Sequence, residues 1–178
     1  MDTALFDSHL HIIDPDFPLV ENNDYLPPAF TVGEYRTRVA GLNVVGGAVV
    51  SGSFQAFDQS YLCAALRRLG PRFVGVTQIP ADTPDERILE LDAAGVRAVR
   101  VNLARGGSVE VSDLDRLARR VHEVAGWHTE LYATDLGPVA GVVRDLPVVS
   151  IGHLGMRPEN LPVLKVLSFL RAASISFW

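Results

Sequence analysis

The feature that most constrains the fold is a repeated alternation of two kinds of segment. Six short apolar runs rich in β-branched residues are each followed by a stretch with helical spacing of its apolar side chains. Such runs are typical of strands buried on both faces of a parallel sheet, with helices as the crossover connections. The sequence therefore predicts an α/β fold, with strands over residues 4–12, 44–51, 73–79, 96–103, 128–133 and 148–153.

Helices are expected between these strands. Thr31 and Glu34 have the spacing of a capping box at a helix start. Ser112 precedes the clearest amphipathic stripe, and Gly126 follows it as a stop signal. The expected helices cover residues 31–41, 58–69, 84–95, 112–125, 135–145 and 158–170.

Two architectures fit this alternation, an open doubly wound sheet and a (β/α)8 barrel of the TIM type. No glycine-rich phosphate loop follows the first strand, and polar residues gather where several strands end, as in barrels. The barrel is therefore favoured, apparently truncated to about six of its eight βα units, as one domain over residues 1–178. The connection at residues 14–30 is long and holds four prolines, which suggests a functional loop.

Composition narrows the function classes. The 16 Lys and Arg residues against 21 Asp and Glu residues give a formal net charge of −5, and no basic cluster stands out. A nucleic acid or an anionic membrane surface is therefore not an expected partner. The first residues carry an acid where a signal peptide carries a base, and no run reaches the roughly 18 apolar residues of a membrane span. A cytoplasmic protein is expected.

The first strand carries the residues best suited to chemistry. Asp7, His9 and His11 alternate near its end, so their side chains are expected on one face of the strand. Two imidazoles at this spacing can bind one metal ion or one substrate oxygen. The alternative is a pair of histidines hydrogen-bonded for structural reasons.

The motif around these histidines resembles a known family. Residues 6–15 are similar to the opening of the amidohydrolase-related barrels (amidohydrolase family 2), in the branch that includes 2-pyrone-4,6-dicarboxylate hydrolase. Four later stretches resemble the ends of strands 2, 4, 5 and 6 of that family in the same order: residues 50–62, 95–103, 126–132 and 148–158. The resemblance covers about residues 4–160, and residues 165–178 do not match it.

The resemblance implies roles for matching positions. His9, His11 and His153 would be the catalytic histidines, and Arg100 would bind a substrate carboxylate through its planar fork of donors. His122 and His128 are expected to be structural. Further substrate contacts would come from Arg105, Tyr132, Tyr25 and Ser53, although Arg105 could equally be a solvated loop charge and Tyr132 a half-buried structural residue.

Three departures from the family pattern affect the expected chemistry. Gly152 stands where members often have Asp before the strand 6 histidine, and no counterpart of the strand 8 Asp that activates water is found after Leu164. Strand 5 ends in Tyr132, where metal-binding members have a histidine. The sequence therefore predicts no required metal. One divalent ion such as Zn, held by His9 and His11, is the alternative.

The expected function is hydrolysis of a small anionic substrate, a carboxylated lactone or related cyclic ester, by water attack on its carbonyl. A metal-dependent decarboxylase of the same superfamily is one alternative. An inactive fragment, or one completed by a partner, is another. The first and sixth strands would be exposed edges of an open barrel, which predicts a possible homo-oligomer through edge pairing.

Overall fold

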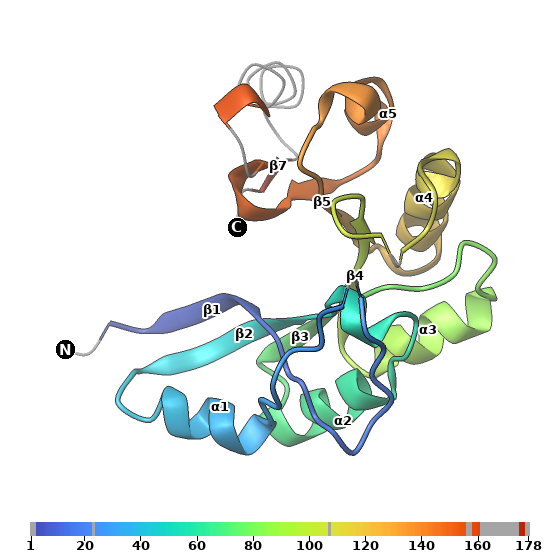
Figure 1. The fold of residues 1–178 in the computed structure, drawn as a ribbon. Coiled ribbons are helices and arrows are strands. Elements are labelled where there is room, and N and C mark those ends of the chain that lie inside the picture. Colours follow the sequence, from blue (N-terminus) through green and yellow to red (C-terminus); the bar gives the residue numbers. More distant parts are fainter. Residues whose placement is uncertain (1–2, 23, 107, 156–157, 161–174, 177–178) are drawn as a thin grey trace.

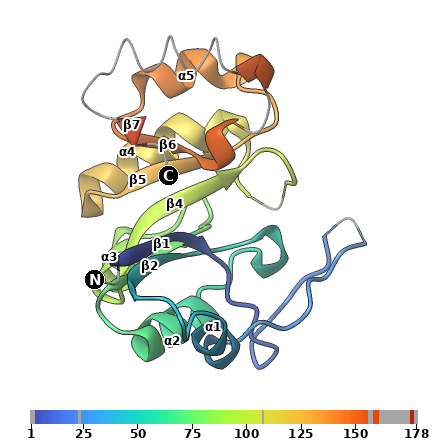
Figure 2. The same cartoon turned by 90° about the vertical axis from the view of Figure 1, so that its left-hand side faces the viewer.

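The computed structural model describes residues 3–22, 24–106, 108–155, 158–160 and 175–176. They contain one sheet of seven parallel strands in the order of the chain. The sheet curls so that the helices lie along its convex outer side (Figures 1 and 2). This half-barrel confirms the predicted α/β class of TIM-barrel type. The strands are β1 (Leu5–Leu10), β2 (Val44–Val50), β3 (Phe73–Thr77), β4 (Val96–Asn102), β5 (His128–Tyr132), β6 (Val149–Ile151) and β7 (Ile175–Ser176).

Within the part of the chain that the structure describes, five α-helices alternate with the strands, and their positions agree with the expected ranges. The capping box is present: the Thr31 hydroxyl accepts from the Glu34 backbone N–H, and the Glu34 carboxylate accepts from the Thr31 backbone N–H at 2.7 Å. Of the helix expected over 158–170, residues Pro158–Asn160 form a 3₁₀ turn, and the rest lies outside the described residues. The helices are α1 (Val32–Arg38), α2 (Ser60–Leu69), α3 (Asp85–Ala93), α4 (Leu114–Ala125) and α5 (Ala140–Asp145).

Most of the core lies between the convex face of the sheet and the helices. One cluster joins β1–β4 to α1–α4, with Trp127 and Tyr61 among its largest fully buried side chains. A second cluster joins β4–β6 to α4 and α5. The concave face has only a small apolar cluster, formed by Val50, Val76 and Ala98 with Ala48. The inner face is therefore free to carry polar groups above this apolar floor.

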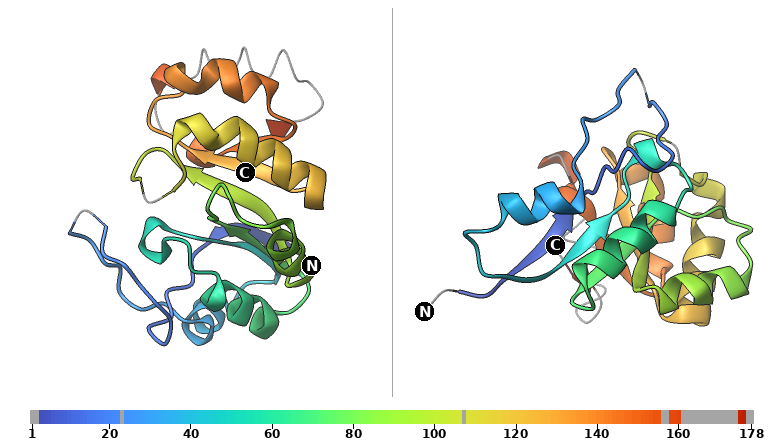
Figure 3. Two further views of the ribbon diagram at one scale, coloured as in Figure 1. Left: turned by 90° about the vertical axis from the view of Figure 1, so that its right-hand side faces the viewer. Right: turned by 90° about the horizontal axis from the view of Figure 1, so that it is seen from below.

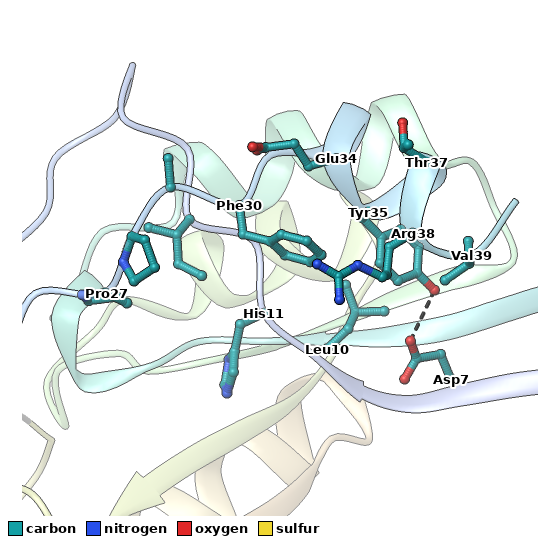
Figure 4. A pocket seen from close by; sticks show the side chains of 13 residues that line it. Asp7, Leu10, His11, Pro27, Phe30, Glu34, Tyr35, Thr37, Arg38 and Val39 are labelled. Carbon is teal, nitrogen blue, oxygen red and sulfur yellow. Dashed lines mark hydrogen bonds between the residues drawn. The ribbon is translucent and has the colours of Figure 1, made fainter.

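A bulge in β1 changes which side chains face inward. Asp7 pairs with Gly47 and Leu10 pairs with Val49, so β1 has one more residue than β2 over this interval. The Tyr35 hydroxyl of α1 donates to Asp7 Oδ2 at 3.1 Å, which places Asp7 on the outer side with α1. Figure 4 shows Asp7 beside Tyr35 and His11 pointing elsewhere. The expectation that Asp7 shares a face with His9 and His11 is therefore wrong, because the extra residue interrupts the alternation.

One of the two edges of the sheet differs from the expectation. β6 was expected to be an edge strand. It instead pairs with β7 through Val149–Ile175 and Ser150–Ser176. Among the described strands, β1 pairs only with β2, and Phe6 on it is 49% exposed. Oligomerisation through this edge stays a prediction. None of the helices in the described residues is long and apolar enough to cross a membrane.

The long connection between β1 and α1 forms an arm that projects from the body (Figure 3). Backbone hydrogen bonds between Ile13 and Phe30 close its base, and a second bridge joins Asn22 to Tyr25 near its tip. The Asn22 side chain donates to the Arg105 carbonyl at 3.3 Å. The arm therefore reaches the loop that follows β4.

The glycine pair in β2 allows a close approach of backbone segments. A Cβ atom at Gly46 would lie 2.4 Å from the Arg72 carbonyl oxygen, whereas one at Gly141 in α5 would meet nothing within 4 Å. We expect Gly46→Ala to lower the free energy of unfolding by about 1–3 kcal/mol, the usual cost of overpacking. Gly141→Ala should leave stability unchanged or raise it by up to about 1 kcal/mol. Urea denaturation of both variants checks this, and equal stabilities would contradict it.

Candidate active site

Strand register places a polar row on the concave face. Val50, Val76 and Ala98 are register partners in the inner apolar cluster, and Arg100 lies two residues beyond Ala98 on the same face of β4. Arg100 pairs with Glu130 of β5. Glu130 in turn pairs with Ser150 of β6. The row of Arg100, Glu130 and Ser150 therefore crosses three neighbouring strands above the apolar floor.

Three histidines and a tyrosine gather at the same side of the sheet. The ring centres of His9 and His11 are 5.0 Å apart, and those of His9 and His153 are 5.1 Å apart. The His153 ring also lies 5.1 Å from the Tyr132 ring at the end of β5. His153 has a left-handed backbone (φ 51°), which is uncommon for a non-glycine residue and is often found at functional sites. The structure thus brings together residues from β1, β5 and the segment after β6.

The surroundings of the three histidines lower their pKa values and so favour their neutral form at pH 7, although His153 is exposed. Burial lowers the pKa of His9 from its usual 6.5 to about 3, with further lowering by His11, Arg100 and His153. Burial and the Arg100 charge also lower the pKa values of His11 and His153. His11 Nδ1 lies 2.7 Å from the Val50 carbonyl oxygen, which can only accept, so Nδ1 carries the proton. Neutral His11 therefore keeps a lone pair on Nε2 and can act as a base or a ligand.

Arg100 is the central cation of the inner face and is only 3% exposed. Its guanidinium carbon lies 4.9 Å from the centre of the Tyr132 ring, and Nη1 donates to the Ser51 carbonyl at 3.3 Å. Its Nε is 3.3 Å from Glu130 Oε1, although the two atoms do not form a hydrogen bond. Burial lowers the pKa of Arg100 and raises that of Glu130, and the attraction between the two opposes both changes.

Several polar atoms of this region have no hydrogen-bond partner. Among the described side chains, the buried atoms in this state are His9 Nε2, Gln78 Oε1, Arg100 Nε, Glu130 Oε1 and Ser150 Oγ. A buried polar atom without a partner costs about 1–3 kcal/mol and calls for an explanation. Four of the five belong to the histidine cluster or the polar row, so a polar ligand that meets them would relieve this cost.

The other expected contact residues lie around this centre. Ser53 is buried at the start of the 3₁₀ turn after β2. Arg105 is exposed in the loop after β4, and Tyr25 is 49% exposed near the tip of the arm. The Asn22 contact to the Arg105 carbonyl brings these two segments together. The Ser51 hydroxyl instead lies 2.7 Å from the Tyr61 hydroxyl of α2 and faces the outer layer.

The remaining histidines lie away from the cluster, as predicted. His122 Nδ1 lies 3.2 Å from the Trp127 carbonyl oxygen, at the end of α4. His128 begins β5, and burial alone lowers its pKa. Each is therefore explained by its local structural setting.

A network of glutamines at the strand ends was not predicted from the sequence. Gln55 donates to the Ile12 carbonyl at 2.7 Å and accepts from the Gly52 N–H at 2.7 Å. Gln78 donates to the Gly52 and Ala56 carbonyls at 3.2 and 3.1 Å, and Gln59 donates to the Gln78 carbonyl at 2.9 Å. These bonds tie together the segments that follow β1, β2 and β3. Their only signal in the sequence is three glutamines close to strand ends.

A separate pocket of about 960 Å³ lies on the outer side of β1, between the arm and α1 (Figure 4). Its lining is mainly apolar and includes Leu10, Ile13, Phe30 and Val39. His11 also borders it, but His9, Arg100 and His153 do not. The polar chemistry therefore lies on the concave face and not in this pocket.

The histidine cluster offers few side-chain donors for a metal ion. Within the described ranges, no three His, Cys, Asp or Glu side chains are placed to hold one together. His9 and His11 remain the residues that could contribute imidazole ligands, as the sequence suggested. The Arg100 charge, which already lowers the pKa values of both histidines, would oppose a second cation beside them.

Comparison with known proteins decides the family. A model of the amidohydrolase family matches residues 6–171. The chain belongs to the amidohydrolase family. This amidohydrolase is 27% identical over 160 residues to a 2-pyrone-4,6-dicarboxylate hydrolase of Comamonas testosteroni, covering 86% of the chain and 52% of that relative. It is 28% identical over 123 residues to a D-galactarolactone isomerase of Agrobacterium fabrum, covering 68% of the chain and 42% of that relative. The chain thus spans about half the length of these curated relatives.

Solved structures share the fold of this amidohydrolase. An apo protein of Agrobacterium tumefaciens superposes with a TM-score of 0.84 at 22% identity, covering 97% of this chain and 66% of that one. A protein of Acinetobacter baumannii, described as a probable 2-pyrone-4,6-dicarboxylic acid hydrolase with citric acid bound, superposes with a TM-score of 0.80 at 23% identity. It covers 97% of this chain and 68% of that one.

The lowered pKa of His9 predicts a pH dependence of stability. Between pH 6.5 and about 3 the unfolded chain binds a proton at this residue and the folded chain does not. Stability should therefore fall as the pH falls through this window. The slope from this residue is at most about 1.4 kcal/mol per pH unit, and it is smaller where solvent screens the ring.

The measurement is urea unfolding of the wild type and His9→Asn from pH 7 to pH 4.5, in buffer with a chelator. The variant should lose part of the slope. Parallel curves for the two proteins would show that His9 does not contribute.

Proposed function

We propose that this amidohydrolase hydrolyses a small carboxylated lactone. The observation that carries the proposal is the Arg100 guanidinium, buried on the concave face, stacked on Tyr132 and close to a cluster of neutral histidines. A guanidinium binds a carboxylate with two parallel hydrogen bonds and so orients the ring that bears it. The names of both curated relatives refer to a lactone or a pyrone carboxylate, which supports this substrate class.

The proposed reaction is attack of water on the lactone carbonyl carbon. His11 Nε2, which keeps a lone pair, accepts a proton from the water as the new C–O bond forms. His9 and His153, whose ring centres lie 5.1 Å apart, would donate a hydrogen bond to the carbonyl oxygen as negative charge develops on it. The ring C–O bond then breaks, and its oxygen takes up the proton that His11 accepted, which returns His11 to its neutral form. The product is an open-chain hydroxy acid.

The residues around this centre are proposed to contact the rest of the substrate. Tyr132 would hydrogen-bond a ring or carboxylate oxygen, and Ser53 would contribute a hydroxyl from the turn after β2. Arg105 and Tyr25, on the two segments joined by Asn22, would approach the end of the substrate that lies away from Arg100. These assignments rest on position and on the chemistry of each side chain.

A second candidate reaction uses the same substrate class. The Agrobacterium relative carries the name of a lactone isomerase, and such an enzyme rearranges the ring without net addition of water. Proton NMR of the product separates the two reactions. Hydrolysis gives an acyclic hydroxy acid, and isomerisation gives a different lactone of the same mass.

The role of Arg100 can be tested with Arg100→Met, which keeps an unbranched apolar stem and removes the guanidinium with its charge. We expect kcat/KM for 2-pyrone-4,6-dicarboxylate or D-galactarolactone to fall about 10- to 100-fold, since a hydrogen bond to a charged group contributes about 1.5–3 kcal/mol. A neutral lactone without a carboxylate is the matched control, and its kcat/KM should fall much less than that of the carboxylated lactones. An equal loss on all the lactones would contradict a carboxylate contact.

We further propose that the reaction requires no metal, because Arg100 already places a positive charge next to the histidines. Lactone turnover should then be unchanged, within about twofold, after dialysis against a chelator. Elemental analysis of the purified protein should give less than stoichiometric zinc or manganese. A stoichiometric ion whose removal abolishes activity would instead favour the decarboxylase alternative.

A further inference from the structure

Glu130 is a buried acid next to the proposed carboxylate-binding residue. Its side chain is 10% exposed and that of Arg100 is 4% exposed, and Glu130 Oε1 lies 3.3 Å from Arg100 Nε. The two residues are also register partners, so the backbone fixes them side by side. A carboxylate at this position affects any anion that approaches Arg100.

The charges on the inner face nearly cancel before a ligand arrives. Arg100 from β4 is the cation that acts on Glu130. Ser150 of β6 is the register partner of Glu130, and Gly152, which follows β6, lies close enough that a Cβ there would be 3.7 Å from Glu130 Oε1. The nearby histidines His9, His11 and His153 are held neutral. One ligand carboxylate at Arg100 leaves this group of charges net negative, and a second carboxylate nearby is then repelled by Glu130 with no further charged cation among the described side chains of the inner face.

The same region contains buried acceptor atoms that make no hydrogen bond among the described residues. Glu130 Oε1 and the Ser150 hydroxyl are both buried and make no hydrogen bond among the described residues. A carboxylate oxygen accepts only, so a matching ligand group must donate. Hydroxyl groups on a ligand supply such donors, whereas a flat pyrone dicarboxylate supplies none.

We propose that Glu130 determines specificity at this site, selecting lactones that carry one carboxylate and several hydroxyls over lactones that carry two carboxylates. This inference rests on the proposed function, in which Arg100 binds the substrate carboxylate. D-galactarolactone has one free carboxylate and several hydroxyls. 2-Pyrone-4,6-dicarboxylate has two carboxylates and no hydroxyl. These two compounds therefore represent the monocarboxylate and the dicarboxylate class of lactone.

The test compares kcat/KM and Kd for these two compounds in the wild type and in Glu130→Gln, which keeps the size of the side chain and removes its charge. The wild type should prefer D-galactarolactone. In the variant, binding of the dicarboxylate should strengthen at least about tenfold, because a like-charge contact is removed. Binding of D-galactarolactone should change less or weaken, so the preference between the two falls at least about tenfold.

Ser150→Ala is the matched variant, since it removes a hydroxyl and leaves the charges in place. It should weaken D-galactarolactone binding only and give no gain for the dicarboxylate. It also keeps the test decisive should Glu130→Gln fail to fold, as judged by circular dichroism. A merely structural role of the row would weaken both ligands alike in either variant.

Three outcomes would overturn the inference. A wild-type preference for the dicarboxylate contradicts it directly. An unchanged preference in Glu130→Gln, with both compounds still bound and still sensitive to Arg100→Met, shows that Glu130 does not select while the proposed function stands. Failure of both compounds to bind, or binding insensitive to Arg100→Met, rejects the proposed function and this inference with it.

Discussion

Parallel pairing of consecutive strands is the constraint on which the site depends. Because β1 to β7 run in one direction and pair in chain order, the ends of all the strands meet at one rim of the curled sheet. Residues as distant in sequence as His9 and His153 then come within 5.1 Å between ring centres. Within the sheet, the strand register also brings distant residues together, because it pairs Arg100 with Glu130 and Glu130 with Ser150. The site is thus a product of the backbone arrangement, and the side chains supply its chemistry.

Much of this arrangement could be predicted from local pattern. The apolar runs gave six strands in nearly the correct ranges, and the Thr31 capping box is present as expected. The bulge in β1 could not be predicted, because it depends on pairing with β2, and it directs Asp7 to Tyr35. β7 was missed because two residues are too few to give a periodic signal.

In the candidate site, too, some residues could be predicted from local pattern and others depend on strand pairing. The histidines and Arg100 belong to recognisable motifs, and the structure brings His9, His11, His153 and Tyr132 together. Glu130 lies in the stretch that resembles strand 5 of the family, but the resemblance implies no role for it, and an acid in an apolar strand does not reveal whether it faces a partner. Only the register with Arg100 shows that it has one. Charge balance inside a barrel is a property of neighbouring strands, so it cannot be read from one strand at a time.

The glutamine network fixes the backbone at the rim of the sheet and does not depend on which side chains its backbone partners carry. Its bonds run from side-chain amides to backbone groups of Ile12, Gly52, Ala56 and Gln78. Backbone groups are the same whatever side chain a position bears. Apart from Gly52, where a Cβ would lie 2.3 Å from the Phe54 ring, side chains in these segments can therefore change while the backbone groups of the network stay the same. Such a framework leaves room for related proteins to acquire different substrates by changing the side chains of the rim while the three glutamines stay in place.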